Sequence, residues 1–189
     1  MTDHTTTDAL KTRILAEIEG VLAALDDSAL ESLVKVLLDA ERIFVTGEGR
    51  SGFMAKAFAM RLMHLGLPVH VVGETTTPAV GAGATVVAVS GSGTTAGTVR
   101  VAEQAVGAGA RVHAVTTAPD SPLGRSAATT LVVPAATKYR RPGEAASVQP
   151  LSSLFDQATH IALDVVALRL AGLLSVDNET ARKAHANTE

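Results

Sequence analysis

Two segments of this sequence are rich in glycine and hydroxyl side chains, which are residue types suited to ligand binding. They are Gly47–Gly52, with the sequence GEGRSG, and Ser90–Thr95, with the sequence SGSGTT. Each follows a run of β-branched residues and precedes a run with helical spacing, which predicts a turn between a strand and a helix. Glycines in such a turn let the backbone approach a ligand, and the free N–H groups of the first helical turn attract an anion. The pattern therefore favours phosphate binding.

The predicted phosphate ligands are residues of the two loops that offer a backbone N–H, a hydroxyl or a guanidinium group. They are Gly49, Arg50, Ser51, Ser90, Gly91, Ser92 and Thr95. Glu48 is the one carboxylate in the two loops, so the predicted pocket consists mostly of neutral donors. Gln149, which precedes Pro150, is a further binding candidate because its amide can bind a sugar hydroxyl.

Three phosphate-binding designs compete for these loops. The Walker A pattern is excluded because neither loop ends in Gly-Lys-Ser or Gly-Lys-Thr. The dinucleotide fingerprint G-x-G-x-x-G matches Gly47, Gly49 and Gly52, and Glu74 follows as an acid about twenty residues on. A dehydrogenase also needs a substrate domain, for which 189 residues leave little room. The monophosphate of a small sugar is favoured because it uses both loops at once.

The elements that position these loops follow from the hydrophobic pattern. Nearly continuous β-branched runs predict strands that are covered on both faces, as in a parallel sheet, and stretches with helical spacing separate them. The predicted strands are residues 43–46, 69–72, 85–89, 112–116 and 129–133, and the predicted helices between and after them are residues 51–65, 94–107, 123–127, 150–174 and 176–185.

The first 40 residues are predicted to form two helices that break at Asp26-Asp27-Ser28, with Ser28 and Glu31 as a capping box. Residues 41–189 hold the sheet core and the C-terminal helices. We therefore expect a single α/β domain over residues 1–189, with a five-stranded, doubly wound, flavodoxin-like parallel sheet and two extra N-terminal helices. Ligands bind at the carboxyl ends of the strands in such a sheet, which is where both loops lie.

Composition narrows the classes of function. The formal net charge is −3 and there is no basic run, which argues against a nucleic-acid partner. The chain has no cysteine and no clustered His, Asp or Glu spacing, so we expect neither thiolate chemistry nor a metal or cofactor. No uninterrupted apolar stretch is long enough to cross a membrane, and the start of the chain lacks an export signal, so we expect a cytoplasmic protein. The apolar surplus of the predicted helices predicts self-association as a homodimer or homotetramer.

Several motifs resemble those of a known family. Ser90–Thr95, after its hydrophobic strand, resembles the phosphate loop of the sugar isomerase (SIS) domain family. A larger set resembles the 6-phospho-3-hexuloisomerases of that family, and this similarity covers almost the whole chain from about Ala40 onward. The motifs of this set are Gly49–Gly66, Val72–Pro78, Pro119–Gly124, Gln149-Pro150-Leu151 with Ser153-Leu154-Phe155, and His185-Ala186-Asn187.

The resemblance implies an isomerase that interconverts D-arabino-hex-3-ulose 6-phosphate and fructose 6-phosphate, in the ribulose monophosphate pathway of formaldehyde fixation. The ketone moves from C3 to C2, and the simplest route is a cis-enediol in which one base takes the proton from C2 and returns it at C3. The reaction needs that base, a donor for the developing oxyanion and a firm hold on the phosphate, but no metal or redox cofactor. Arg50 is a candidate for the oxyanion donor.

Three residues are candidates for catalysis. Asp156 is the expected base, because it follows Leu154-Phe155 at the position where the resembling family usually has a glutamate. His185 is the second candidate, since a matching C-terminal histidine of SIS isomerases reaches a sugar site, sometimes from a neighbouring subunit. We expect it to assist ring opening. His64 is the third candidate, and it lies at helical spacing from apolar neighbours.

Two alternatives stay open at this point. The chain could isomerise another phosphosugar, such as a pentose 5-phosphate or a sedoheptulose phosphate. It could also be a non-catalytic sensor of sugar phosphates, because SIS-type domains serve as effector modules of regulators. A sensor needs the phosphate site but no base, and the first 40 residues are too short and too acidic for the DNA-binding segment that usually accompanies such a module.

Overall fold

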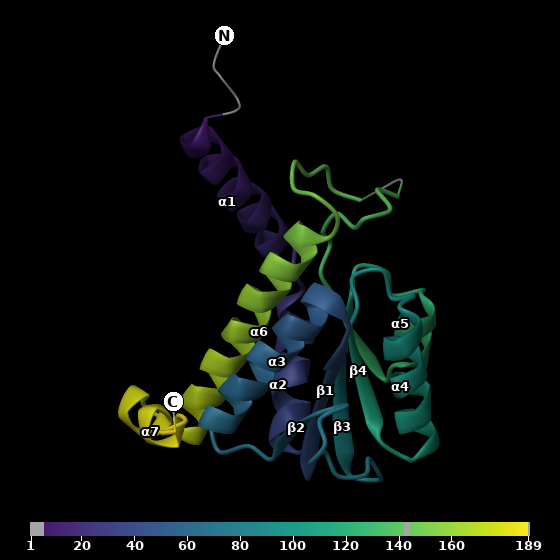
Figure 1. The fold of residues 1–189 in the computed structure, drawn as a ribbon, viewed down its shortest axis with the longest axis vertical. Helices are drawn as coiled ribbons and strands as arrows, with labels where there is room; N and C mark the ends of the chain where they lie inside the picture. The colour runs from purple at the N-terminus through teal and green to yellow at the C-terminus, as the bar shows by residue number, and fades with distance from the viewer. Residues whose placement is uncertain (1–5, 142–143, 189) are drawn as a thin grey trace.

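The structure is a computed structural model that describes residues 6–141 and 144–188, and in it five parallel strands form one sheet (Figure 1). The strands lie in the order β2-β1-β3-β4-β5, which confirms the flavodoxin-like arrangement predicted from the sequence. They are β1 (Arg42–Gly47), β2 (Val69–Val71), β3 (Ala84–Val89), β4 (Arg111–Thr116) and β5 (Thr129–Val132). The first residues of the chain, on which the expectation about an export signal rests, lie outside the described part.

Burial on both faces explains why these segments form a parallel sheet. All six residues of β3, at the centre of the sheet, are buried, and β4 is buried from its second residue onward. β1 lies between β2 and β3, with Ile43 opposite both Val69 and Thr85. β-branched side chains pack well on such a surface, because their restricted rotamers suit extended backbone.

The helices cover the two faces of the sheet unequally (Figure 1). α1, α2, α3 and α6 share one large core with one face, whereas α4 and α5 pack on the other face in a smaller, alanine-rich core. Ile43 and Val45 point into the larger core and Phe44 into the smaller one, as the alternation of a strand requires. The bounds are α1 (Thr7–Ala23), α2 (Asp27–Leu38), α3 (Gly49–His64), α4 (Ala96–Gly107), α5 (Pro122–Ser126), α6 (Ser153–Leu174) and α7 (Asn178–Ala184).

The start of α2 differs from the prediction. Asp26 caps this helix, because its Oδ1 accepts hydrogen bonds from Ser28 N at 2.9 Å and from Ser28 Oγ at 2.7 Å. The predicted capping box of Ser28 and Glu31 is therefore wrong. The aspartate takes the capping position because a carboxylate is a strong acceptor beside the positive end of a helix.

α6 runs through the larger core and packs against α1, α2 and α3. It begins at Ser153 and not at residue 150, because Leu151 has a φ angle of 55° and interrupts the helical backbone. By length and composition alone α6 could cross a membrane, but many of its side chains are buried in the core of this chain. Its first turn also holds a buried carboxylate, that of Asp156, which is costly in an apolar environment.

Candidate active site

The two glycine-rich loops lie side by side at the carboxyl edge of the sheet. Gly47, the last residue of β1, pairs with Val89, the last residue of β3, so the loops that follow these two strands are neighbours. The first loop leads into α3 at Gly49 and the second into α4 at Ala96. Two helical N-termini with free N–H groups therefore lie at the same edge, an arrangement that favours an anion.

Glycines permit the close packing of the first loop. A Cβ atom at Gly52 would lie 2.6 Å from the carbonyl oxygen of Gly47. Gly49 has a φ angle of 58°, in the left-handed region that favours glycine. The G-x-G-x-x-G spacing therefore has a reason in this chain that does not depend on a dinucleotide. Glu74, the acid of the dinucleotide alternative, instead pairs with Lys56 at 2.9 Å.

Asp156 is buried at the junction of α6 with the first loop, and its side chain is engaged by two residues of α3. Its Oδ1 accepts a hydrogen bond from Ser51 Oγ at 2.9 Å, and its Oδ2 accepts one from Arg50 Nε at 3.2 Å. The neighbouring Phe155 packs its ring against Gly91 of the second loop, where a Cβ atom would lie 3.0 Å from the ring. The first turn of α6 therefore contacts both predicted phosphate loops.

The surroundings of Asp156 suit a general base. Burial raises the pKa of this carboxyl group, whereas the hydrogen bond from Ser51 and the charge and hydrogen bond of Arg50 lower it; the effect of burial is the largest, and the net shift is upward. A carboxylate with a raised pKa accepts a proton more readily than one in water. Arg50 contacts this carboxylate, and its side chain is more than half exposed.

The hydroxyl groups of the second loop bind one another. Ser90 Oγ and Thr95 Oγ1 are 2.9 Å apart, and Ser92 Oγ accepts hydrogen bonds from the N–H and the hydroxyl group of Thr94 at 3.2 and 3.0 Å. Ser90 and Ser92 are buried, and Thr95 is the N-cap of α4. Hydroxyl groups can rotate to donate to an incoming anion, so this loop keeps the donors that phosphate binding requires.

Sequence reasoning missed the residues that support this second loop from β4. The Gly91 carbonyl oxygen accepts hydrogen bonds from Thr116 Oγ1 at 3.2 Å and from the N–H and hydroxyl of Thr117 at 3.1 and 2.9 Å. Two threonines at the tip of the neighbouring strand are the signal that could have indicated this support. They join the loop between β3 and α4 to the carboxyl end of β4.

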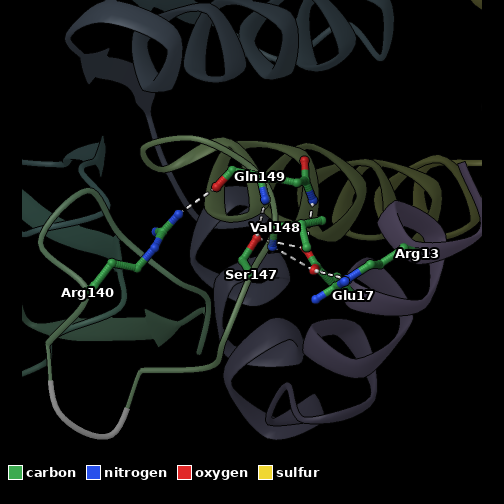
Figure 2. A network of polar contacts seen from close by, with 6 residues as sticks. All are labelled: Arg13, Glu17, Arg140, Ser147, Val148 and Gln149. Carbon is green, nitrogen blue, oxygen red and sulfur yellow. Dashed lines mark hydrogen bonds and ion pairs between the residues drawn. The ribbon is translucent and has the colours of Figure 1, made fainter. Parts of the chain in front are cut away.

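Gln149 lies in a separate polar network that joins α1 to the loop before α6 (Figure 2). Its Nε2 donates to Glu17 Oε2 at 3.3 Å, and its backbone oxygen accepts a hydrogen bond from Arg140 at 2.5 Å. The side-chain amide that was expected to bind a sugar hydroxyl therefore already has a partner on α1. A contact between Gln149 and the substrate stays a prediction.

His64 and His185 lie at the other end of α3, far from Asp156. With a rise of 1.5 Å per residue, the stretch of α3 from Arg50 to His64 spans about 21 Å. The rings of His64 and His185 stack there, with their centroids 5.1 Å apart and an interplanar angle of 20°. Burial, followed by the charges of His185 and Arg61, lowers the pKa of His64. One chain thus brings the two histidines together but separates them from the candidate base.

No group of three or more His, Cys, Asp or Glu side chains that could hold a metal ion occurs among residues 6–141 and 144–188.

Comparisons with known proteins place the chain in a family. The model of the SIS domain matches residues 36–167. A protein of Mycobacterium gastri named 3-hexulose-6-phosphate isomerase is 43% identical over 173 residues, which cover 92% of this chain and 86% of the relative. A protein of Bacillus subtilis (strain 168) with the same name is 38% identical over 176 residues, which cover 93% of this chain and 95% of the relative.

A solved structure gives the same result for the fold. It is a protein of Methanococcus jannaschii, described as inferring a molecular function of 3-hexulose-6-phosphate isomerase, with a TM-score of 0.83 and 28% identity. The match covers 94% of this chain and 98% of that protein. From the match to the domain model and the identity with these relatives, the chain belongs to the SIS domain family, in the branch that includes the proteins named 3-hexulose-6-phosphate isomerase.

Proposed function

We propose that the chain is an isomerase that interconverts D-arabino-hex-3-ulose 6-phosphate and fructose 6-phosphate, working as one catalytic domain. The observation that carries this proposal is the buried carboxylate of Asp156, which lies in a helical turn that contacts both glycine-rich loops. The names of the relatives that share 38–43% of their residues with the chain support the same reaction.

In the proposed mechanism, the second loop and the N-terminus of α4 bind the substrate phosphate through Ser90, Ser92 and Thr95. The ionised carboxylate of Asp156 takes the proton from C2, and the electron pair of that C–H bond forms the C2–C3 double bond of the enediol. Arg50 stabilises the negative charge that develops on the C3 oxygen. Asp156 then returns the proton to C3. The C2 hydroxyl gives up its proton as it becomes the new carbonyl, and the C3 oxygen takes up a proton to become a hydroxyl, so no atoms are gained or lost.

Ser51 has two possible partners in this scheme. It was predicted to bind the phosphate, and in the structure its hydroxyl donates to Asp156. We propose that it also orients the base, because a hydrogen bond from a fixed donor restricts the rotation of the carboxylate. Gly49 and Gly91 contribute by allowing the backbone of both loops to approach the ligand.

His185 can contribute to this reaction from a second copy of the chain. The separation of about 21 Å along α3 excludes direct action of His185 on a substrate at Asp156 of the same chain. We therefore propose a homodimer or homotetramer in which His185 assists ring opening in the site of another copy. Exposed apolar side chains on α3 and α6 support self-association: Phe53, Met60, Met63, Ile161, Val165 and Leu168. A cytoplasmic location is part of the proposal, since a chain without cysteine suits a reducing compartment.

The position of Asp156 favours an enzyme over a sensor. Burial of an ionisable group costs stability, and such costly groups are common at active sites. Binding of a sugar phosphate by hydroxyl and N–H groups does not need this carboxylate, whereas proton transfer does. The proposed loops would bind a phosphate group, which all the candidate sugars carry. Only an experiment can therefore distinguish a hexulose phosphate from another phosphosugar as the substrate.

The test is an assay in which the purified protein receives hex-3-ulose 6-phosphate and the formation of fructose 6-phosphate is followed by a coupled enzyme. We expect rapid conversion, and slow or no conversion of pentose 5-phosphates and sedoheptulose phosphate under the same conditions. Faster turnover of one of those sugars would assign the chain to a different phosphosugar. Tight binding of a sugar phosphate without turnover of any would identify a sensor.

A further inference from the structure

The loop between β5 and α6 leads directly to the candidate base. It leaves β5 at the carboxyl edge of the sheet and ends at Ser153, in the turn that contains Asp156 (Figure 1). The last part of the loop is continuous with the helix, because Ser153 N donates to the Pro150 oxygen at 3.1 Å and Asp156 N donates to the Ser152 oxygen at 3.0 Å. A shift of this part of the loop therefore shifts the base.

Glu17 of α1 holds this loop. Its Oε2 accepts a hydrogen bond from Ser147 Oγ at 2.7 Å and one from Gln149 Nε2 at 3.3 Å, and its Oε1 accepts one from Val148 N at 2.9 Å (Figure 2). Arg13 lies one helical turn before it, with its Nε 3.7 Å from Oε1. The Glu17 side chain is only 12% exposed. One carboxylate thus binds three consecutive loop residues that are about 130 positions away in the sequence.

The charge of Glu17 strengthens these contacts. Burial alone would raise the pKa of its carboxyl group, but the hydrogen bonds from Val148, Ser147 and Gln149 and the charge of Arg13 lower it, and the net shift is downward. The ionised form is therefore the one that the loop stabilises. Hydrogen bonds to a charged acceptor are about twice as strong as those between neutral groups.

Arg140 holds the same segment from the opposite side. Its guanidinium group donates to the backbone oxygens of Gln149 at 2.5 Å and of Leu151 at 2.7 Å, and also to that of Thr137. Gln149 therefore lies between two opposite charges, with its side chain bound to Glu17 and its backbone to Arg140 (Figure 2). The loop of twenty residues between β5 and α6 is thus held by one charged group within it, Arg140, and by one from a distant helix, Glu17.

We propose that Glu17 is a positioning residue for the isomerase reaction, because through Ser147, Val148 and Gln149 it sets where the first turn of α6 presents Asp156. This role rests on the proposed function, because its effect on rate can be measured only if the protein is an isomerase. It also gives the N-terminal helix α1 a part in catalysis at a distance from the substrate. A displacement of about 1 Å in a catalytic group can cost on the order of 100-fold in rate.

A second glutamate provides a matched control for a contact that only joins an N-terminal helix to the rest of the fold. Glu31 of α2 also joins an N-terminal helix to α6, through hydrogen bonds from Arg169 at 2.8 and 3.3 Å. That ion pair is exposed and lies more than three helical turns beyond Asp156. Loss of Glu31 removes a contact between an N-terminal helix and α6 without touching the loop.

The experiment compares Glu17→Ala, Glu17→Gln and Glu31→Ala in steady-state kinetics. We expect Glu17→Ala to lower kcat by about 10-fold or more while KM changes by less than about threefold, because the phosphate loops stay intact. Glu17→Gln should recover most of the rate, since its amide oxygen still accepts a hydrogen bond from the loop, and Glu31→Ala should match the native enzyme. Native kcat in Glu17→Ala, or equal losses in Glu17→Ala and Glu31→Ala, would overturn the inference.

Hydrogen exchange provides a readout that does not depend on activity. Amides 147–156 should exchange faster in Glu17→Ala than in the native protein, and at the native rate in Glu31→Ala. Unchanged exchange of this segment in Glu17→Ala would overturn the inference as well. If the native protein isomerises no sugar phosphate, the proposed function fails, and the exchange result still decides whether Glu17 positions the turn.

Discussion

The two ends of α3 hold different kinds of chemistry. At its N-terminal end, Arg50 and Ser51 bind the buried carboxylate of Asp156, beside two glycine-rich loops and two helical N-termini. At its C-terminal end, His64 stacks on His185. A groove of about 360 Å³ lies there between α3, α6 and the start of α7, lined mostly by apolar side chains.

The difference indicates which end of α3 favours an anion. The N-terminal end offers free N–H groups, hydroxyls and an arginine, which together attract an anion. At the C-terminal end the helix dipole is negative, which does not favour an anion. His64 Nε2 is buried there, and among the residues that the structure describes it has no hydrogen-bond partner. Residues that the sequence places in one active site are therefore divided between two ends of one helix.

Removal of the base should give the largest effect. We expect Asp156→Asn to lower kcat by ~100-fold or more in both directions of the reaction, the usual scale for a general base. Asp156→Glu should retain far more activity, because it keeps a carboxylate at the position where the resembling family has one. Steady-state kinetics with each hexulose phosphate check this, and near-native turnover in Asp156→Asn would move the base to another residue.

The same substitution should affect stability in the opposite sense. Burial raises the pKa of Asp156 above its value in the unfolded chain, so its ionisation destabilises the fold as pH rises through the folded pKa. At neutral pH Asp156→Asn should therefore unfold at the same or a higher temperature than the native protein, which calorimetry can measure. A clearly lower melting temperature would show that the hydrogen bonds from Ser51 and Arg50 outweigh the cost of burial.

The second loop should control binding more than rate. Ser90→Ala or Ser92→Ala should raise KM by ~10- to 100-fold with a smaller change in kcat, because a hydrogen bond to a charged group contributes about 1.5–3 kcal/mol. Ser126→Ala is the matched control, since the Ser126 hydroxyl binds a backbone oxygen of its own helix α5. Unchanged kinetics in both loop variants would mean that the loop is a turn without a role in phosphate binding.

The smallest expected effect concerns His113, which lies in β4 and takes part in neither of the two groups of residues at the ends of α3. Burial, followed by the charge of Arg111, lowers its pKa to about 4. The unfolded chain therefore binds a proton to this histidine more readily, and native stability should fall as pH drops from about 6.5 towards 4. Melting temperatures over this range should fall less steeply in His113→Leu, and identical slopes would assign the acid sensitivity to other groups.

The fold was predictable because its signals are local. Continuous β-branched runs such as Thr85–Val89 indicate strands that are buried on both faces, and the loops between strands and helices indicate the ligand-binding edge. The start of α2 shows the limit of such signals, since Asp26 and Ser28 are both good caps and the geometry selects the former.

The site was only partly predictable, because its contacts join distant parts of the chain. The resemblance to a family indicated Asp156. Its hydrogen-bond partners Arg50 and Ser51, however, lie more than 100 residues before it in the sequence. The contacts of Glu17 with Ser147–Gln149 leave no pattern in either segment. His64 and His185 were both identified as candidates. Their spacing in the sequence does not show that they stack on each other, nor that they do so at the end of α3 that is far from Asp156 of the same chain.

Mixing two variants tests the central claim most directly, namely that Asp156 and His185 act on one substrate from different copies of the chain. Asp156→Asn and His185→Ala are unfolded and refolded together, and the consumption of fructose 6-phosphate is compared with that of each variant treated alone. Each variant alone should be slow, and the mixture should recover about a quarter of native activity, because mixed assemblies contain some sites with both native groups. A mixture no faster than the mean of the two variants, or a His185→Ala enzyme with native turnover, would contradict the account.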